Sequence, residues 1–292
     1  MTAPAAATYP VELQSRVDDY LAELRFAREE SVGGLEEAMR YSLLAGGKRI
    51  RPVLAMATAE ALERDPGEIL PMAAAIELIH TYSLIHDDLP AMDDDELRRG
   101  QPTCHVKFGE DVAILAGDGL FAEAIALVAR EQRGEPERVL AALGHLVGAA
   151  GVGGMVGGQY LDITVGDEVD LRRVHELKTG RLIGASIECV LMLEGVSGPA
   201  TISWSRFAAE LGVLFQIVDD ILDVTGDEAA LGKPQGSDER QGKRTYVSVF
   251  GLQRARELAA ESHEKARGAL AEASGSTETL TRITDYILTR RT

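Results

Sequence analysis

The feature that most constrains the fold is the spacing of apolar residues, which recur every three or four positions along almost the whole chain. Near the start, Leu13, Val17, Leu21 and Leu24 follow this spacing, which places them on one face of a helix. No stretch alternates apolar and polar residues for long enough to demand a strand. Aromatic residues make up only 5% of the chain, which favours packed helices over a β-sandwich. We therefore predict an all-α fold.

Glycine and proline residues divide this pattern into separate helices. Gly33-Gly34 and Gly46-Gly47 follow the first two helical patterns, and Pro52 stands near the start of the third, where a missing N–H costs nothing. No linker, low-complexity tract or clean repeat divides the chain, so we expect residues 1–292 to form one domain. The expected helices cover residues 11–30, 35–44, 52–62, 66–88, 111–130, 136–154, 170–193, 201–224, 246–271 and 278–289.

The charge balance and the cysteines limit the partners and the compartment. Lys and Arg total 30 against 47 for Asp and Glu, a formal net charge of −17. A nucleic-acid-binding protein normally carries the opposite balance, because phosphate neutralisation supplies most of its affinity. The two cysteines, Cys104 and Cys189, lie far apart, which argues against a disulfide scaffold or a zinc cluster. We expect a cytoplasmic protein that binds no nucleic acid.

Neither a signal peptide nor a membrane span is expected. Residues 1–10 lack a basic stretch followed by an apolar core. Residues 141–158 are apolar except for His145, but seven of these 18 residues are glycine, and 18 is a borderline length for spanning a membrane. Several of these glycines stand four residues apart, a spacing that allows close helix approach. The plain interpretation of the glycines is therefore tight packing.

Two acidic clusters are the strongest chemical signal. Residues 87–96 contain six carboxylates, and Asp219, Asp220 and Asp223 form a second group. Apolar residues precede both clusters, so each is expected on a buried helix. Like charges at this density repel unless something neutralises them, and Mg²⁺ typically binds one or two carboxylates plus substrate phosphates. Solvated helix ends are the alternative for either cluster alone, but the joint occurrence favours a metal site.

Basic residues accompany both acidic clusters. Residues 46–52 bring a glycine-containing, unobstructed backbone and positively charged side chains to the start of a helix. This combination is typical of an anion-binding site. Arg98-Arg99 follow the first cluster, Lys178-Thr179 lie within a later helix, and Lys233 and Lys243 follow the second cluster. Each cation alone is explained equally well by a solvated surface position. Together they indicate a pocket for a ligand or ligands carrying more than one diphosphate.

Seven motifs occur in a fixed order along the chain. They are GGKRIRP (46–52), IELIHTYSLIHDDLPAMDDDELRRGQPTCH (76–105), GGMVGGQYLDI (153–163), ELKTGRL (176–182), FQIVDDILDVTGD (215–227), LGKPQGSD (231–238) and QGKRTY (241–246). In these motifs the chain resembles the trans-isoprenyl diphosphate synthase (polyprenyl synthetase) family, and within it the bacterial farnesyl diphosphate synthase branch. The resemblance implies a single-domain bundle of about ten mostly antiparallel helices around a deep central cavity, and a homodimer.

The resemblance also implies roles for the acidic and basic residues. Three Mg²⁺ ions are expected with substrate bound, held by Asp87, Asp88, Asp93, Asp94, Asp219, Asp220 and Asp223. The allylic diphosphate is expected to contact Arg98, Lys178, Gln216, Lys233 and Lys243, and isopentenyl diphosphate to contact Gly47, Lys48, Arg51, His80 and Arg99. Lys178, Thr179 and Gln216 match groups near the developing allylic cation, and Arg290-Arg291 resemble a basic tail that closes over the homoallylic substrate.

The implied reaction is a head-to-tail (1′-4) condensation of isopentenyl diphosphate with dimethylallyl or geranyl diphosphate. Metal ions and cations stabilise the departing diphosphate, orientation replaces a bimolecular encounter, and excluding water protects the allylic cation. The implied product is farnesyl diphosphate (C15), and geranylgeranyl diphosphate (C20) is the alternative. A class I terpene cyclase and a non-catalytic prenyltransferase subunit are less well matched, because a second diphosphate pocket and both acidic motifs are present. A membrane-bound aromatic prenyltransferase would need several spans.

Product length needs a steric floor in the cavity. Each buried CH₂ gains about 0.8 kcal/mol, so room for one more five-carbon unit would favour a longer product by roughly 3–4 kcal/mol. Tyr82 stands five residues before Asp87, about 7.5 Å deeper along the helix. Helical-wheel geometry places Ser83 closer than Tyr82 to the face of Asp87. Both residues are therefore candidates for setting the chain length.

Overall fold

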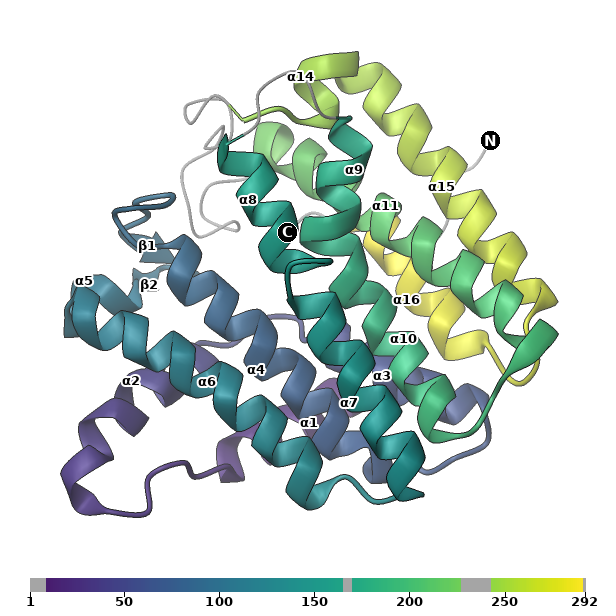
Figure 1. Ribbon diagram of the computed structural model, residues 1–292. Coiled ribbons are helices and arrows are strands. Elements are labelled where there is room, and N and C mark those ends of the chain that lie inside the picture. Colours follow the sequence, from purple (N-terminus) through teal and green to yellow (C-terminus); the bar gives the residue numbers. More distant parts are fainter. Residues whose placement is uncertain (1–8, 165–169, 227–242, 291–292) are drawn as a thin grey trace.

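The computed structural model describes residues 9–164, 170–226 and 243–290. These residues form a bundle of helices (Figure 1), which confirms the predicted all-α fold. The first part of the chain forms α1 (Val11–Glu23), α2 (Gly33–Leu43), α3 (Ile50–Ala61), α4 (Leu70–Asp87), α5 (Cys104–Phe108), α6 (Glu110–Glu131), α7 (Pro136–Ala150) and α8 (Met155–Thr164). The second part forms α9 (Leu171–His175), α10 (Arg181–Leu193), α11 (Thr201–Thr225), α14 (Tyr246–Phe250), α15 (Leu252–Glu272) and α16 (Glu278–Thr289).

Short helical turns connect several of these helices. The 3₁₀ turns η1 (Glu30–Val32), η2 (Pro66–Ile69) and η4 (Gly198–Ala200) precede α2, α4 and α11. A π-helical turn, η3 (Glu176–Gly180), joins α9 to α10. π-Helical turns are rare and occur frequently at functional sites. This one carries two of the predicted site residues, Lys178 and Thr179.

Several predicted helices are shorter or divided in the structure. The first ends at Glu23 rather than near residue 30, because Leu24 has an extended backbone with ψ at 136°. The helix expected over residues 136–154 ends at Ala150 as α7, because Gly151 has an extended backbone, and α8, which was not predicted, begins only at Met155. The helix expected over residues 246–271 is broken at Gly251, where φ is 80°. A left-handed backbone favours glycine, so this break coincides with the residue that permits it.

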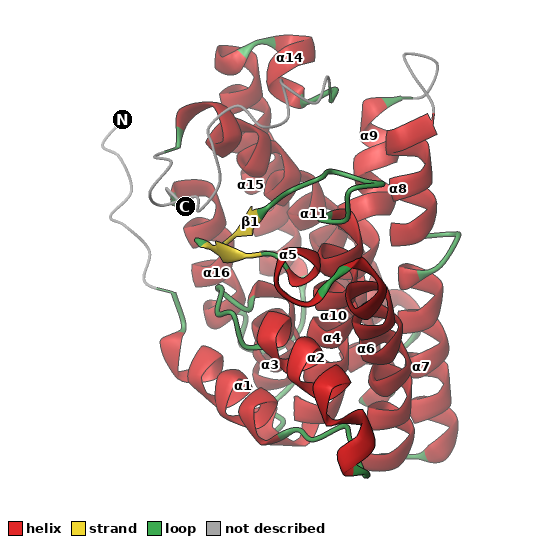
Figure 2. Cartoon of the chain, turned by 90° about the vertical axis from the view of Figure 1, so that its left-hand side faces the viewer, coloured by secondary structure: helices red, strands yellow, loops and turns green. Residues whose placement is uncertain are grey.

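A two-stranded hairpin is a further element that periodicity did not predict. β1 (Leu97–Arg98) pairs antiparallel with β2 (Gln101–Pro102), and Figure 2 shows this hairpin in yellow among the helices. Strands of two residues are too short to give an alternating pattern. The connecting residues, Arg99 and Gly100, both have positive φ, at 53° and 75°. The turn fixes the directions of the two adjacent arginines that follow the first acidic cluster.

The core is built around α4 and α10. α4 packs along α6 and also contacts α3, while α10 lies between α7 and α11, and α11 packs along α15. In Figure 1, α8, α9 and α14 lie in the upper part of the view, and β1 and β2 lie at its left side. Asp87 ends α4 and the second acidic cluster lies near the end of α11. The packing therefore brings the two acidic motifs to the same end of the molecule.

In the part of the chain that the structure describes, three helical stretches are long and apolar enough to cross a membrane. They cover Pro66–Asp87, Glu110–Glu131 and Pro136–Thr164. In the first, 72% of the apolar window is buried inside the bundle, whereas the third is only 33% buried. The third includes residues 141–158, so its seven glycines do not remove it from this class.

Candidate active site

A cavity of about 570 Å³ lies between α4, α8, η3 and α11. It brings together residues that the sequence places up to 239 positions apart, from Arg51 to Arg290. Predicted site residues that line it are Arg51, His80, Tyr82, Ser83, Asp87, Lys178, Thr179 and Asp219. Lining residues to which the sequence analysis assigned no site role are Leu84, His86, Met92, Met155, Val156, Gln159, Tyr160, Ile163 and Phe215, and Arg290 was only a weak match.

Asp87 and Asp88 are adjacent in the chain but have different surroundings. Asp87 lines the cavity, and its Oδ1 accepts a hydrogen bond from Gln159 Nε2 at 2.8 Å. Burial raises the pKa of Asp87 to about 6, against the opposing effect of Lys178. Asp88 is buried away from the cavity, where Arg98 Nε donates to both of its oxygens at 2.7 and 2.8 Å. Asp87 is thus the carboxylate presented to a ligand.

The chain after α4 folds back and returns Asp93 to Asp87. The N–H of Asp93 donates to the carbonyl of Asp87 at 2.9 Å. Lys243, from the segment before α14, donates to both Asp93 oxygens at 2.9 and 3.0 Å. Asp94 adopts a left-handed backbone with φ at 54°. The first acidic motif is therefore a compact loop whose charge is partly neutralised by a lysine from a distant part of the chain.

The second acidic cluster has the same division of roles. Asp219 lines the cavity and forms an ion pair with Arg290. Asp220 is buried, and it accepts hydrogen bonds from Gln216 Nε2 and from the N–H of Tyr246, both at 2.7 Å. Asp223 is also buried, at 5% exposed. Among these three carboxylates, Asp219 is the one that faces the cavity.

The π-helical turn η3 presents Lys178 and Thr179 to the cavity. Lys178 Nζ donates to Asp162 Oδ2 at 2.5 Å, and Thr179 Oγ1 donates to Gln216 Oε1 at 2.8 Å. The Gln216 side chain continues this hydrogen-bond chain from Thr179 to Asp220. On the other side, α8 approaches so closely that a Cβ at Gly158 would overlap the backbone of Lys178. The turn is therefore held in place on both sides.

A cluster of basic side chains surrounds His80. Burial lowers the pKa of His80 well below 6.5, and Arg51, Arg99 and Arg98 lower it further. Arg51 lies over the Phe215 ring, 5.6 Å from its centroid, and its buried Nε has no hydrogen-bond partner. The histidine is thus kept neutral inside a strongly positive region, and such a region favours a multivalent anion.

Lys48 and Arg99 extend this basic cluster to residues 46–48. Arg99 donates to the carbonyl of Gly46, and a side chain at Gly47, where φ is 114°, would collide with the Arg99 guanidinium. Burial, and to a smaller extent Arg290, lower the pKa of Lys48 to about 8, against the opposing effect of Asp219. The predicted basic residues near the start of α3 and in the turn between β1 and β2 therefore lie close together. Gly47, Lys48 and Arg99 do not line the cavity between α4, α8, η3 and α11.

Carboxylate oxygens of the two acidic motifs are donors of the kind that a divalent cation binds. In the described ranges no group of three or more His, Cys, Asp or Glu side chains is arranged to hold one ion. Instead, Asp87 and Asp219 line the cavity, Asp93 lies beside Asp87, and basic side chains pair with Asp93 and Asp219. Mg²⁺ needs only one or two carboxylates when substrate phosphates complete its coordination. The donor set therefore fits magnesium bound together with a diphosphate.

Some predicted residues cannot be placed, and some contacts were not anticipated. Lys233 and Arg291 lie outside the described residues. Gln159 and Asp162 contact Asp87 and Lys178, yet the sequence analysis assigned them no role. Both belong to the motif GGQYLDI at residues 157–163, where they stand three apart. Residues at this spacing share a helix face, a signal that could have paired them with the cavity.

Comparisons with known proteins give one consistent result. The polyprenyl synthetase family matches residues 33–286. The chain is 44% identical over 269 residues to a farnesyl diphosphate synthase of Geobacillus stearothermophilus, covering 90% of this chain and 91% of the relative. It is 43% identical over 265 residues to a chloroplastic geranylgeranyl pyrophosphate synthase of Capsicum annuum, covering 89% of this chain and 71% of the relative.

A solved structure extends the similarity to the fold. A geranyltransferase of Helicobacter pylori, complexed with magnesium and isoprenyl diphosphate, superposes with a TM-score of 0.83 at 32% identity. The match covers 99% of this chain and 97% of the Helicobacter chain.

Proposed function

Because the chain belongs to the polyprenyl synthetase family, we propose that it joins isopentenyl diphosphate head-to-tail to dimethylallyl or geranyl diphosphate, with farnesyl diphosphate as the main product. The observation that carries this proposal is the cavity in which Asp87 and Asp219 face a common space beside Lys178. The carboxylates and lysines can bind a metal-bound diphosphate. The apolar side chains that line the same cavity can contact a prenyl chain.

The acidic side of the cavity would hold the allylic diphosphate. Asp87, Asp93 and Asp219 would be magnesium ligands, supported by Asp88, Asp94, Asp220 and Asp223. Bound Mg²⁺, three ions in this proposal, would neutralise the charge that develops on the diphosphate as the allylic C–O bond breaks. Lys178 and Lys243 would exchange their carboxylate partners for phosphate oxygens, and Arg98, Gln216 and Lys233 would add further contacts.

The basic cluster around His80 would hold isopentenyl diphosphate. Arg51 has a buried Nε without a partner, and Lys48 and Arg99 add positive charge beside it. A neutral His80 donates one hydrogen bond without contributing to the repulsion among the cations. Gly47 keeps open the space that the Arg99 guanidinium occupies. This arrangement would place the isopentenyl double bond next to the allylic carbon.

The remaining residues would protect the cation and direct the bond formed. The Thr179 hydroxyl, the Gln216 side chain and the Lys178 carbonyl would stabilise positive charge on the allylic carbon as it leaves the diphosphate. That carbon bonds to the terminal carbon of the isopentenyl double bond, and the resulting cation loses a proton to the departed diphosphate. Apolar side chains such as Met155 and Phe215 would exclude water, which would otherwise capture the cation.

The product proposed is C15, with C20 as the second candidate. Tyr82 lines the cavity and is only 9% exposed, which supports a closed floor below Asp87. Ser83 lines the cavity too, so it remains a second candidate for the floor. The similarity to a geranylgeranyl pyrophosphate synthase supports the longer product.

We also propose a cytoplasmic homodimer that binds neither nucleic acid nor membrane. Both cysteines are free and buried, which agrees with a reducing compartment. Ile114 and Leu115 on α6 and Leu140 on α7 are 45%, 55% and 69% exposed, and exposed apolar side chains of this kind mark association surfaces. One contiguous hydrophobic core among the described residues supports the proposal of a single domain over residues 1–292. Light scattering of the purified protein would give its oligomeric state.

Incubation with isopentenyl and dimethylallyl diphosphates plus Mg²⁺, followed by sizing of the products, tests the function. We expect farnesyl diphosphate from the wild type and a loss of about 100-fold or more in turnover for Asp219→Ala. Asp19→Ala is the matched control, because Asp19 is exposed on α1 away from the cavity. Cyclic hydrocarbons as products would indicate a terpene cyclase. Absence of condensation, or full activity in Asp219→Ala, would overturn the proposal.

A further inference from the structure

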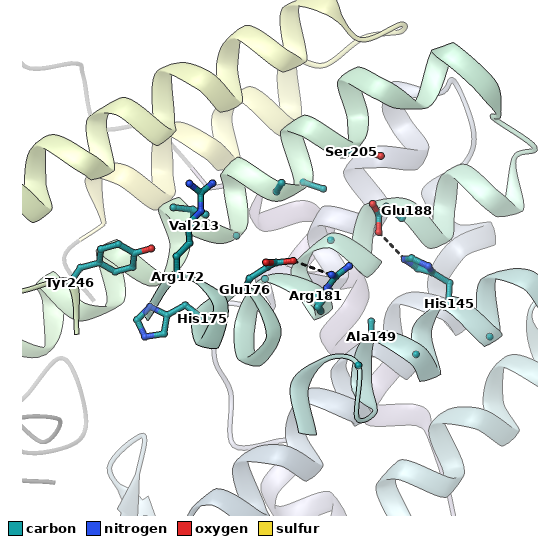
Figure 3. A pocket seen from close by; sticks show the side chains of 18 residues that line it. His145, Ala149, Arg172, His175, Glu176, Arg181, Glu188, Ser205, Val213 and Tyr246 are labelled. Carbon is teal, nitrogen blue, oxygen red and sulfur yellow. Dashed lines mark hydrogen bonds and ion pairs between the residues drawn. The ribbon is translucent and has the colours of Figure 1, made fainter. Parts of the chain in front are cut away.

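A second cavity lies beside η3. It measures about 420 Å³ and is formed by α7, α9, α10 and α11 (Figure 3). It shares no lining residue with the active-site cavity, but η3 contributes to both. Lys178 and Thr179 of this turn line the active site, whereas Glu176 and Gly180 line the second cavity. A volume in this range is typical of small-molecule sites, which run from about 300 to 1,000 Å³.

Glycines form part of the wall, and they are not explained by close packing. A Cβ built at Gly144, Gly148 or Gly153 would meet no atom within 4 Å. At Gly154 and Gly158, by contrast, it would overlap the backbone of a neighbouring segment. Within the described residues, close packing therefore explains Gly154 and Gly158 but not Gly144, Gly148 and Gly153. Glycine inside a helix is destabilising relative to alanine, and at Gly144 and Gly148 its effect is to leave the cavity empty of side chains.

The carboxylates of the cavity are already paired. Glu176 Oε1 lies 3.0 Å from Arg181 Nη2, and Glu188 Oε2 lies 2.8 Å from His145 Nε2. Figure 3 shows both contacts as dashed lines. Arg172 forms no ion pair with any other described residue and lies near Tyr246. One cationic lining side chain, Arg172, is therefore left without an ion-pair partner among the described residues. An anionic group on a ligand would complement it.

A buried histidine also lacks a partner in this cavity. His175 lines the wall, is only 8% exposed, and has an Nδ1 without a hydrogen bond. Its ring lies 5.4 Å from that of Tyr246, centroid to centroid. Burial lowers the pKa of His175 to about 4, so the ring is neutral at physiological pH. Buried polar atoms are nearly always hydrogen-bonded, and one that is not points to a missing partner.

We propose that this second cavity binds a small amphipathic anion, with its charged group at Arg172 and His175 and its apolar body along the glycine wall. The chemical class is an aromatic or aliphatic molecule that carries one carboxylate, sulfonate or phosphate group. The site is separate from the one that would bind the prenyl diphosphates. It therefore does not depend on the proposed reaction.

Fluorescence titration with 1-anilinonaphthalene-8-sulfonate tests this site, because the probe combines an aromatic body with one sulfonate. We expect Gly148→Leu, which fills the cavity, to weaken binding at least tenfold, and Arg172→Gln to weaken it several-fold. Gly148→Leu replaces a helical glycine in open space, so the variant is expected to fold and to retain condensation activity. Circular dichroism and product assays check both points.

Two further variants locate the probe. Ala141→Leu places the same leucine side chain on α7, at an exposed position outside the cavity. This variant should bind the probe as the wild type does. Ser83→Phe fills the active-site cavity and should also leave this affinity unchanged. Binding that survives Gly148→Leu, or that is lost in Ser83→Phe alone, would overturn the proposal. So would absence of probe binding to the wild type.

Discussion

Adjacent carboxylates in both acidic motifs have opposite tasks. Asp87 and Asp219 face the cavity, whereas Asp88 is bound by Arg98 and Asp220 by Gln216 and Tyr246. Successive residues of a helix point about 100° apart, so two neighbouring aspartates cannot both reach one ligand. The second aspartate of each pair instead fixes a group that belongs to the site. A repeated Asp-Asp sequence therefore encodes one ligand and one support.

Lys48 gives a prediction about pH. Its pKa is lowered to about 8, first by burial, so the ammonium is charged below pH 8 and loses its proton above it. Binding of a diphosphate needs the charged form. We therefore expect kcat/KM for isopentenyl diphosphate to be level below about pH 7 and to fall up to tenfold per unit well above pH 8. Steady-state kinetics across this range measures the effect.

Lys48→Arg is the control for this profile. Arginine stays charged throughout the range, so the decline should move to higher pH while activity at pH 7 is largely kept. A decline at the same pH in Lys48→Arg would assign it to another group.

Tyr82 gives a prediction about product length. Its ring stands edge-on to those of His86 and Phe121, with centroids 5.8 and 5.2 Å away. This support makes the aromatic floor rigid. Tyr82→Ala should open the cavity and shift the main product from C15 to C20, because each added methylene gains about 0.8 kcal/mol on burial. Chromatography of the dephosphorylated products measures this shift.

Ser83→Ala distinguishes the two candidates for the floor. The Ser83 hydroxyl donates to the carbonyl of His80 at 2.9 Å, and its removal frees little space. The product should stay C15. An unchanged product in Tyr82→Ala would show that Tyr82 does not set the length.

At the scale of elements, η3 connects the acidic motifs to the rest of the site. It lies against Gly158 of α8 on one side and Gly212 of α11 on the other. A Cβ at Gly212 would stand 2.9 Å from the Cα of Gly180. These two glycines allow the turn to approach both helices closely. The position of Lys178 therefore depends on residues that make no contact through a side chain.

Gly158→Ala and Gly144→Ala form a matched pair. The methyl group at residue 158 overlaps the backbone of Lys178, so we expect a loss of about 1–3 kcal/mol in stability and reduced activity. The methyl group at residue 144 enters open space, so we expect unchanged activity and a gain of up to about 1 kcal/mol. Thermal unfolding and product assays measure both. Equal effects of the two substitutions would contradict the clamping of η3.

The elements also show how much the sequence could predict. Long apolar periodicity was enough to predict α6, α11 and α16 closely, because amphipathic spacing dominates over many turns. It could not locate the break at Gly151 or the π-helical turn, since both depend on close contacts between distant segments. The same limit applies to the site. The motifs nominated Asp87 and Asp219, but the pairing of Lys243 with Asp93 depends on tertiary structure.

At the scale of the whole molecule, residues near the two ends of the chain lie together at the site. Tyr9 donates to the carbonyl of Lys48 at 2.6 Å, and its ring lies 4.8 Å from that of Tyr286, centroid to centroid. Arg290 lies over the Phe215 ring at 4.4 Å and pairs with Asp219. Segments more than 270 residues apart in the sequence therefore share one environment. Ligand binding there should stabilise the entire bundle.

Thermal unfolding in the presence of inorganic pyrophosphate and Mg²⁺ tests this. At a ligand concentration of 100 times Kd the stabilisation is about 2.7 kcal/mol, or roughly 5 °C in Tm for a chain of this size. Pyrophosphate alone, or with a chelator that removes Mg²⁺, should give a smaller rise. Asp87→Asn combined with Asp219→Ala is the control and should abolish the metal-dependent part. An equal rise with chelator present would contradict a shared metal–diphosphate site.

The pairing of Asp93 with Lys243, of Asp219 with Arg290 and of Asp88 with Arg98 has a further consequence. The repulsion that two acidic clusters would create is already offset by the chain's own cations. The newly synthesised chain can therefore fold into the bundle before it binds any magnesium. In a cell short of magnesium, the enzyme would be folded but inactive, and it would become active when magnesium binds.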